Sequence, residues 1–142
     1  MEARLDGRNA VITGGSAGIG KAIAKSFLTS GANVSIVARR SEVLTAAKAE
    51  IEAEGAVTGT SGKVIALSAD IRNSEECEKV IAKTQAAFGH VDVLVNNAGT
   101  SQRGDFLEVS DEIWQDDLDL KLFSAVRLCR LVIPGMRSRK WG

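Results

Sequence analysis

The chain has 142 residues, of which 44% are hydrophobic and 25% charged, and its formal net charge is zero. This length and apolar content suit one globular domain with a core, and they exclude a disordered chain. The neutral balance gives no basic surface for nucleic acid or an anionic membrane, and no apolar run is long enough to span a bilayer. The N-terminal residues lack the apolar stretch of a signal peptide, so we expect a cytoplasmic protein.

Hydrophobic periodicity alternates between strands and helices along the chain. Short apolar runs predict strands over residues 9–13, 33–38, 63–70 and 91–99, the last including its polar exit. Helical patterns predict helices over residues 19–30, 41–54, 74–88 and 111–133, with a small polar loop over 55–62. Four β-α units in alternation predict an α/β fold with a Rossmann-like, doubly wound parallel sheet.

The expected ends of the helices follow from glycines and short polar residues. Gly31, Gly55 and Gly89 are expected to end the first three helices. Ser41 is expected to cap the second helix, and Asn73 or Ser74 the third.

The fourth strand is expected to lie at the edge of the sheet, because the chain ends after the helix that follows it. Its run VDVLV (91–95) is continuously apolar, a pattern typical of a strand buried on both sides. We therefore expect residues 1–142 to be the N-terminal part of a larger domain, truncated after four β-α units.

The glycine-rich stretch VITGGSAGIGKAIA (11–24) is typical of a phosphate-binding turn, and two interpretations compete. Counted from Gly15, it is one residue short of the mononucleotide P-loop. A P-loop also needs a hydroxyl after its lysine to ligate Mg²⁺, and Ala22 stands there. Asp70, after the third strand, is an acid that leaves the nucleotide triphosphatase alternative open.

Counted from Thr13, the stretch TGGSAGIG (13–20) has the spacing of a dinucleotide-binding turn. Gly14 permits the tight turn, Gly18 lets the backbone approach a pyrophosphate, and Gly20 lets the helix pack closely on the sheet. The second strand ends in Ala-Arg-Arg (38–40), where an NAD site would place an acid. A guanidinium there favours NADP(H), because it can bind a 2′-phosphate.

Together, TGGSAGIG (13–20), Ala-Asp-Ile (69–71) and NNAG (96–99) resemble the short-chain dehydrogenase/reductase family over the whole chain, with ketoacyl-carrier-protein reductases as the most similar type. The resemblance implies an NADP(H)-dependent oxidoreductase acting on an alcohol or carbonyl. It implies that the three glycines line the pyrophosphate, with Ser16 and Arg39 near the 2′-phosphate. It also implies that Asn96 fixes the central strands. The implied cofactor-binding residues are Gly14, Ser16, Gly18, Ile19, Gly20, Arg39, Arg40, Asp70, Ile71, Asn97, Ala98 and Gly99, with Asp70 and Ile71 at the adenine and Asn97 under the ribose.

Two departures from the family bear on catalysis. Lys121 stands where the family usually has the asparagine of a proton relay, and a solvated helix lysine is an equal alternative. The family's serine and Tyr-x-x-x-Lys are missing, and the chain contains no tyrosine. The only histidine, His90, is expected in a turn at the opposite end of the sheet. We therefore expect no catalytic residue in this chain, no metal site, and no activity from the chain alone.

The helix over 111–133 carries a wide apolar surface in LFSAVRLCRLVI (122–133). The resemblance implies that one of its faces packs against a second copy, and burial within its own domain is the alternative. We expect a dimer or higher homo-oligomer formed through this helix and the edge strand over 91–97, with no nucleic-acid or membrane partner. A non-catalytic dinucleotide-binding or scaffold protein remains the alternative function.

Overall fold

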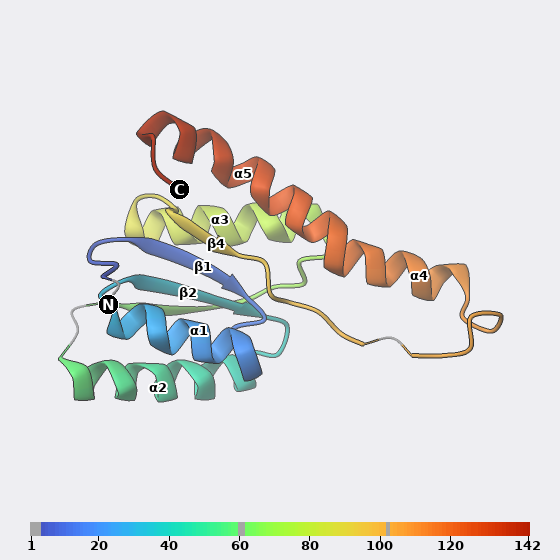
Figure 1. Cartoon of the computed structure of the whole chain (residues 1–142), viewed down its shortest axis with the longest axis horizontal. Coiled ribbons are helices and arrows are strands. Elements are labelled where there is room, and N and C mark those ends of the chain that lie inside the picture. The colour runs from blue at the N-terminus through green and yellow to red at the C-terminus, as the bar shows by residue number, and fades with distance from the viewer. Residues whose placement is uncertain (1–3, 60–61, 102) are drawn as a thin grey trace.

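The computed structural model describes residues 4–59, 62–101 and 103–142, which form a parallel α/β sheet with helices on both faces (Figure 1). The strands are β1 (Asn9–Thr13), β2 (Asn33–Ala38), β3 (Val64–Ser68) and β4 (Val93–Val95). Their spatial order is β3-β2-β1-β4, and every neighbouring pair is parallel. The predicted Rossmann-like, doubly wound architecture is confirmed.

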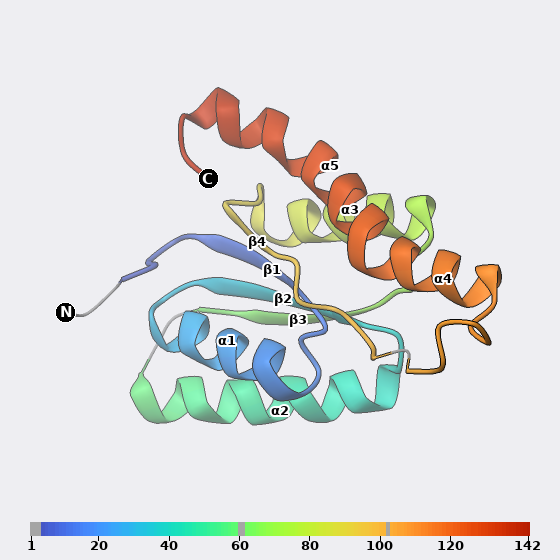
Figure 2. The same ribbon diagram turned by 45° about the vertical axis from the view of Figure 1, so that its right-hand side comes forward.

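The helices separate into two layers on either side of the sheet (Figure 2). α1 (Gly18–Thr29) and α2 (Ser41–Thr58) cover one face, where they enclose a core that includes Ile12, Ile36 and Ile51. α3 (Ser74–Phe88) and α5 (Ser124–Arg139) cover the other face, around Val11, Val80 and Leu128. β1 and β2 lie between the two cores and are almost completely buried.

Helix α2 is longer than the sequence predicts. It continues through Gly55 to Thr58 and ends at Gly59, which adopts a left-handed conformation with φ +70°. The buried stripe of α2 continues from Ile51 to Gly55, so packing against the sheet overrides the weak helix propensity of glycine. The loop predicted over 55–62 is therefore wrong for 55–58, and residues 60–61 lie outside the described residues.

The caps of the second and third helices differ in how well they follow the prediction. Asn73 caps α3, because its side chain accepts hydrogen bonds from the backbone N–H groups of Glu75 and Glu76. Ser41 is instead the first residue of α2, and Arg40 occupies the cap position without a side-chain cap. The predicted Ser41 cap is therefore wrong.

The predicted helix over 111–133 is a longer and less regular unit. It consists of α4 (Asp111–Leu118), a π-helical turn η1 (Asp119–Phe123) and α5, and it continues past Pro134 to Arg139. The predicted end at residue 133 is wrong. Two contacts hold the extra turn: the Arg139 guanidinium donates to the Val91 carbonyl at 2.6 Å, and Arg8 lies 3.7 Å over the Trp141 ring.

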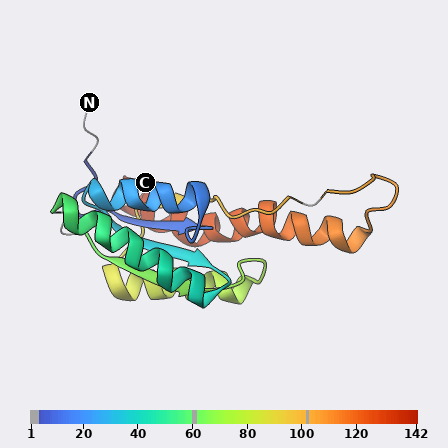
Figure 3. The same ribbon diagram turned by 90° about the horizontal axis from the view of Figure 1, so that it is seen from below.

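The fourth strand is also shorter than the predicted 91–99, and it pairs with β1 alone among the described strands. Its side chains are partly buried, which fits the predicted place at the sheet edge. Beyond it, α4 and the segment that leads to it extend past the sheet as an arm, visible both from the front and from below (Figures 1 and 3).

Candidate functional site

The site begins at the turn between β1 and α1. Gly14 and Gly18 take left-handed backbone conformations, with φ +66° and +51°. Ala17 precedes α1 without a side-chain cap, so the first N–H groups of the helix have no side-chain acceptor there. A free helix N-terminus with its positive dipole end is suited to a phosphate group.

Gly20 lies behind this turn, where a side chain has no room. A Cβ atom at Gly20 would lie 2.3 Å from the Gly14 carbonyl oxygen and 2.5 Å from Nδ2 of Asn97. The glycine therefore permits the close helix–sheet packing that the spacing predicts.

Asn97 and Thr13 join the ends of β4 and β1. The Asn97 side chain donates to the Thr13 carbonyl at 3.0 Å, and the buried Thr13 hydroxyl accepts from the backbone N–H groups of Asn97 and Ala98, each at 3.0 Å. Among the described residues Asn97, and not Asn96, makes these bonds, and the strand-fixing role of Asn96 stays a prediction. Asn96 is exposed and donates only a long contact, 3.7 Å, to the sulfur of Cys129.

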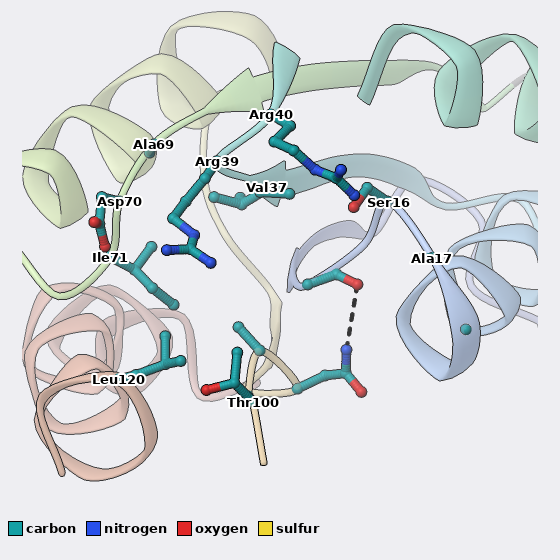
Figure 4. Close-up of a pocket in the computed structure, with 16 residues that line it drawn as sticks. Ser16, Ala17, Val37, Arg39, Arg40, Ala69, Asp70, Ile71, Thr100 and Leu120 are labelled. Carbon is teal, nitrogen blue, oxygen red and sulfur yellow. Dashed lines mark hydrogen bonds between the residues drawn. The ribbon is translucent and has the colours of Figure 1, made fainter. Parts of the chain in front are cut away.

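Two arginines follow the carboxyl end of β2. The Ser68 hydroxyl anchors the backbone by donating to the Arg39 carbonyl at 2.8 Å. The Arg39 side chain is exposed and points into the site, whereas Arg40 extends toward the side of Ser16 (Figure 4). No described residue forms a hydrogen bond or ion pair with the Arg39 guanidinium, so its donors are available to a ligand.

Asp70, after β3, is held by Arg72. The Arg72 guanidinium reaches the Asp70 carboxylate at 2.6 Å through Nη2, and its backbone N–H donates to Oδ1 at 3.1 Å. The hydrogen bond from the Arg72 side chain is the main cause of a lowered pKa for Asp70. The same guanidinium reaches Asp116 of α4 at 2.5 and 2.7 Å. Asp70 is thus a fixed, ionised acceptor.

These elements enclose one cleft of about 690 Å³ at the carboxyl ends of the strands. This is the expected place for a ligand in an open α/β sheet. The predicted residues that line it are Gly14, Ser16, Gly18, Arg39, Arg40, Asp70, Ile71, Asn97, Ala98 and Gly99. Gly20 supports the cleft from behind, and Ile19 is 74% exposed outside its lining.

Six further lining residues were missed by the sequence analysis: Ala17, Val37, Ala38, Ala69, Thr100 and Leu120. Ala17, Ala38 and Ala69 lie inside the predicted motifs, and Val37 and Thr100 directly adjoin them, so the motifs could have indicated all five. Leu120 comes from the π-helical turn, and only the packing of that turn against the cleft identifies it (Figure 4).

The two lysines singled out in the sequence lie outside the lining of the cleft. Lys21, which would be the P-loop lysine, pairs with Glu50 of α2 at 2.8 Å. Lys121 lies in η1 and donates to Asp117 at 2.9 Å. It is nevertheless close to the cleft, because a Cβ atom on Gly99 would be 3.9 Å from its Cε atom. π-Helical turns often occur at functional sites.

His90 precedes β4, at the end of the sheet opposite the glycine turn, as predicted. Its Nε2 atom lies 3.1 Å from the buried carboxylate of Asp92.

The described residues contain no cluster of three or more metal-binding side chains. None of the described helices is both long and apolar enough to cross a membrane.

Comparison with known proteins agrees with this geometry. The family model described as short chain dehydrogenase matches residues 8–142. The chain therefore belongs to the short-chain dehydrogenase/reductase family. Membership of this family decides against the P-loop alternative.

Curated relatives of the chain include dehydrogenases from fungi and bacteria. A short chain dehydrogenase of Pseudocercospora fijiensis is 36% identical over 144 residues, covering all of this chain and 45% of the relative. D-beta-hydroxybutyrate dehydrogenase of Cupriavidus necator is 36% identical over 138 residues, covering 97% of this chain and 51% of the relative. The chain thus spans about half the length of the curated relatives it matches.

Solved structures in the family share the fold closely. L-sorbose reductase from Gluconobacter frateurii, complexed with NADPH and L-sorbose, superposes with a TM-score of 0.89 and 38% identity, over 98% of this chain and 51% of that one. A metagenomic short-chain oxidoreductase in complex with NADP gives a TM-score of 0.88 and 34% identity, over 97% of this chain and 60% of that one.

Proposed function

We propose that this chain is the cofactor-binding, N-terminal portion of an NADP(H)-dependent short-chain dehydrogenase/reductase. The observation that carries the proposal is the Arg39 guanidinium, which points into the cleft across from the glycine turn without a partner among the described residues. The similar reductases solved with NADPH and NADP support the same cofactor for this chain.

The residues of the cleft can be assigned to the parts of such a cofactor. The N-terminus of α1, with Gly14 and Gly18, would bind the pyrophosphate. Arg39, with Ser16 and Arg40 beside the turn, would bind the 2′-phosphate by charge-assisted hydrogen bonds. Asp70 would accept from the adenine amino group beside the Ile71 backbone. Asn97, with Ala98 and Gly99, would lie under the adenosine ribose.

The cofactor supplies a hydride for transfer to or from a carbonyl or alcohol carbon. This chain's own residues bind and orient the cofactor, and we propose that they do not complete the reaction. Carbonyl reduction needs a proton donor, which typically contributes about 10²–10⁴-fold, and the sequence contains no tyrosine to serve as one. A preparation whose mass confirms the 142-residue chain should show no NADPH oxidation with a panel of carbonyl substrates. Turnover that is lost on Lys121→Met would instead make Lys121 the donor.

We also propose that the chain self-associates through the outer face of α5 and the edge strand β4. An apolar groove on that face is lined by residues that include Leu122, Val126 and Ile133. Half of the Leu122 side chain and 41% of Ile133 are exposed. Sedimentation at about 50 μM, in the range where exposed apolar surface drives association, should show a dimer or larger species. Ile133→Glu should shift it toward the monomer, and a monomeric unmodified chain would contradict this proposal.

Nucleotide selectivity tests the cofactor assignment. The chain should bind NADPH roughly 10–100-fold more tightly than NADH, the range expected for charge-assisted bonds to one phosphate. Arg39→Asp should remove or reverse that preference. Lys79→Glu, the same charge change on an exposed helix face away from the cleft, should preserve it. Equal affinities for both nucleotides, or Mg²⁺-dependent ATP binding, would refute the assignment. Binding of NADPH without any turnover would leave the non-catalytic binding module as the function of the isolated chain.

A further inference from the structure

Arg72 occupies a position between the cleft and the arm. It follows β3 by a few residues, its side chain is 28% exposed, and it contacts one carboxylate on each side. On the cleft side, Nε lies 3.0 Å from Oδ1 of Asp70 and Nη2 lies 2.6 Å from Oδ2. On the arm side, Nη1 lies 2.5 Å from Oδ1 of Asp116. We call these ion pairs the Arg72 bridge.

The bridge matters to α4 because this helix is otherwise held mainly by its continuation into η1 and α5 and by the edge contact of Trp114 with Phe106. None of the residues of α4 is buried. Its apolar side chains Ile113, Trp114 and Leu118 are 40%, 47% and 41% exposed. Asp116 lies in the middle of α4, so the bridge joins this helix directly to the end of β3.

A second arginine reinforces the same connection from α5. Arg127 donates from Nη1 to the Arg72 carbonyl at 2.6 Å and from Nη2 to Asp119 Oδ1 at 3.2 Å. The turn over 70–72 is therefore held by hydrogen bonds both to the backbone and to the side chain of Arg72. If α4 and η1 moved, these bonds would shift the turn and with it the carboxylate of Asp70.

The orientation of Asp70 is the property that the bridge controls. Three N–H groups of Arg72, from its backbone, Nε and Nη2, donate to the carboxylate, and Nε is shared between the two oxygens. An ionised carboxylate has about four acceptor sites, so about one site is left. Asp70 lines the cleft, so this remaining site is available to a ligand there. Arg72 thereby fixes the acceptor without consuming it.

We propose that Arg72 is a positioning residue that holds Asp70 ready for the adenine amino group and couples adenine binding to the docking of helix α4. This inference rests on the proposed function, since Asp70 is the adenine acceptor only in a dinucleotide site. Coupling of this kind is reciprocal: whatever steadies α4 tightens adenine binding, and adenine binding steadies α4.

The first measurement needs no nucleotide. Amide hydrogen exchange of α4 is compared in the unmodified chain, Arg72→Met, Asp116→Asn and the control Lys48→Met, which removes an exposed ion pair with Glu52 on α2. Exchange in α4 should be about fivefold faster in the first two variants, the effect of losing a partly exposed ionic contact, and unchanged in the control. Equal exchange in all four proteins would overturn the coupling to α4.

The second measurement compares NADPH with its analogue in which hypoxanthine replaces adenine, so that a carbonyl stands in place of the amino group. The unmodified chain should bind NADPH about tenfold more tightly than the analogue, the value of one charge-assisted hydrogen bond. Arg72→Met should weaken NADPH binding by a similar factor and change analogue binding by less than about twofold. Asp116→Asn should act in the same direction with a smaller effect.

Three results would decide otherwise. Equal losses for NADPH and the analogue in Arg72→Met would make Arg72 a general structural residue. An unchanged or higher preference for adenine in that variant would show that Asp70 needs no positioning. Binding of neither nucleotide by the unmodified chain would refute the proposed function and the adenine role together, and the exchange measurement would still decide whether the bridge holds α4.

Discussion

The sheet with α1 and α2 differs sharply from the arm, which consists of α4 and the segment that leads to it. In the first region, apolar side chains such as Ile12, Ile36 and Leu44 are at most 1% exposed. In the second, Phe106 is 77% exposed and α4 buries nothing. The cofactor cleft lies where the two meet, so its walls are rigid on the glycine side and depend on ionic contacts on the α4 side. Packing fixes the first wall, and the Arg72 bridge fixes the second.

The largest expected effect is on the free energy of unfolding, which should fall much more for a substitution in the packed core than for the same substitution in α4. Ile36→Ala should lower the free energy of unfolding by about 2–5 kcal/mol, because it removes buried methyl groups and leaves a cavity. Ile113→Ala makes the same chemical change on the 40% exposed side chain in α4 and should cost only about 0.5 kcal/mol. Urea unfolding of both variants measures the difference. Similar losses would contradict the contrast between the regions.

A second comparison tests the close approach at the glycine turn. Gly20→Ala should destabilise the fold by about 1–3 kcal/mol and abolish tight nucleotide binding, because the new methyl group meets backbone 2.3 Å away. Gly135→Ala, toward the end of α5, meets a side chain and not backbone, with Nη1 of Arg139 at 3.0 Å, and should change the stability by less than about 1 kcal/mol. Thermal unfolding and NADPH titration of the two variants give both readouts. A stable, nucleotide-binding Gly20→Ala protein would show that the turn can relax.

The smallest effect concerns pH and the Arg72 bridge. The pKa of Asp70 is lowered from an ordinary value of 3.8 mainly by the Arg72 hydrogen bond. The pair therefore stabilises the fold above about pH 4, and this contribution is lost as the pH falls through the lowered pKa. Arg72→Met should cost at most about 1 kcal/mol at pH 6, since solvent screens the partly exposed pair. Unfolding at pH 6 and pH 2 should show the difference between the two proteins shrinking. A constant difference would show that burial of the side chain, and not its charge, matters.

The sequence predicted the packed region better than the arm, for a physical reason. Buried strands such as 9–13 and 33–38, and the glycine spacing at 13–20, leave local patterns that only one fold satisfies. Two of the missed boundaries arise because tertiary contacts overrule local signals: α2 continues through Gly55 along its buried stripe, and α5 continues past Pro134 to the Arg139–Val91 contact.

In the candidate site, too, the sequence identified what local patterns determine and missed what tertiary contacts determine. Residues that follow directly after a strand, such as Arg39 and Asp70, were identified because strand ends converge at one edge of the sheet. Roles that depend on which side chains meet in space were not. The sequence favoured Asn96 as the residue joining the strands, whereas Asn97 makes the bonds to Thr13. Arg72 had no signal, since its partner Asp116 lies 44 residues further along the chain.

The central claim is that this chain holds the adenosine and pyrophosphate half of NADP(H). The most direct test is calorimetric titration with NADPH and with 2′-phospho-ADP-ribose, which lacks the nicotinamide. Because the residues that line the cleft account for the adenosine and phosphate end, the two ligands should bind with affinities within about threefold, or about 0.7 kcal/mol, of each other. A preference for NADPH of about 100-fold, or binding of neither ligand, would contradict the account.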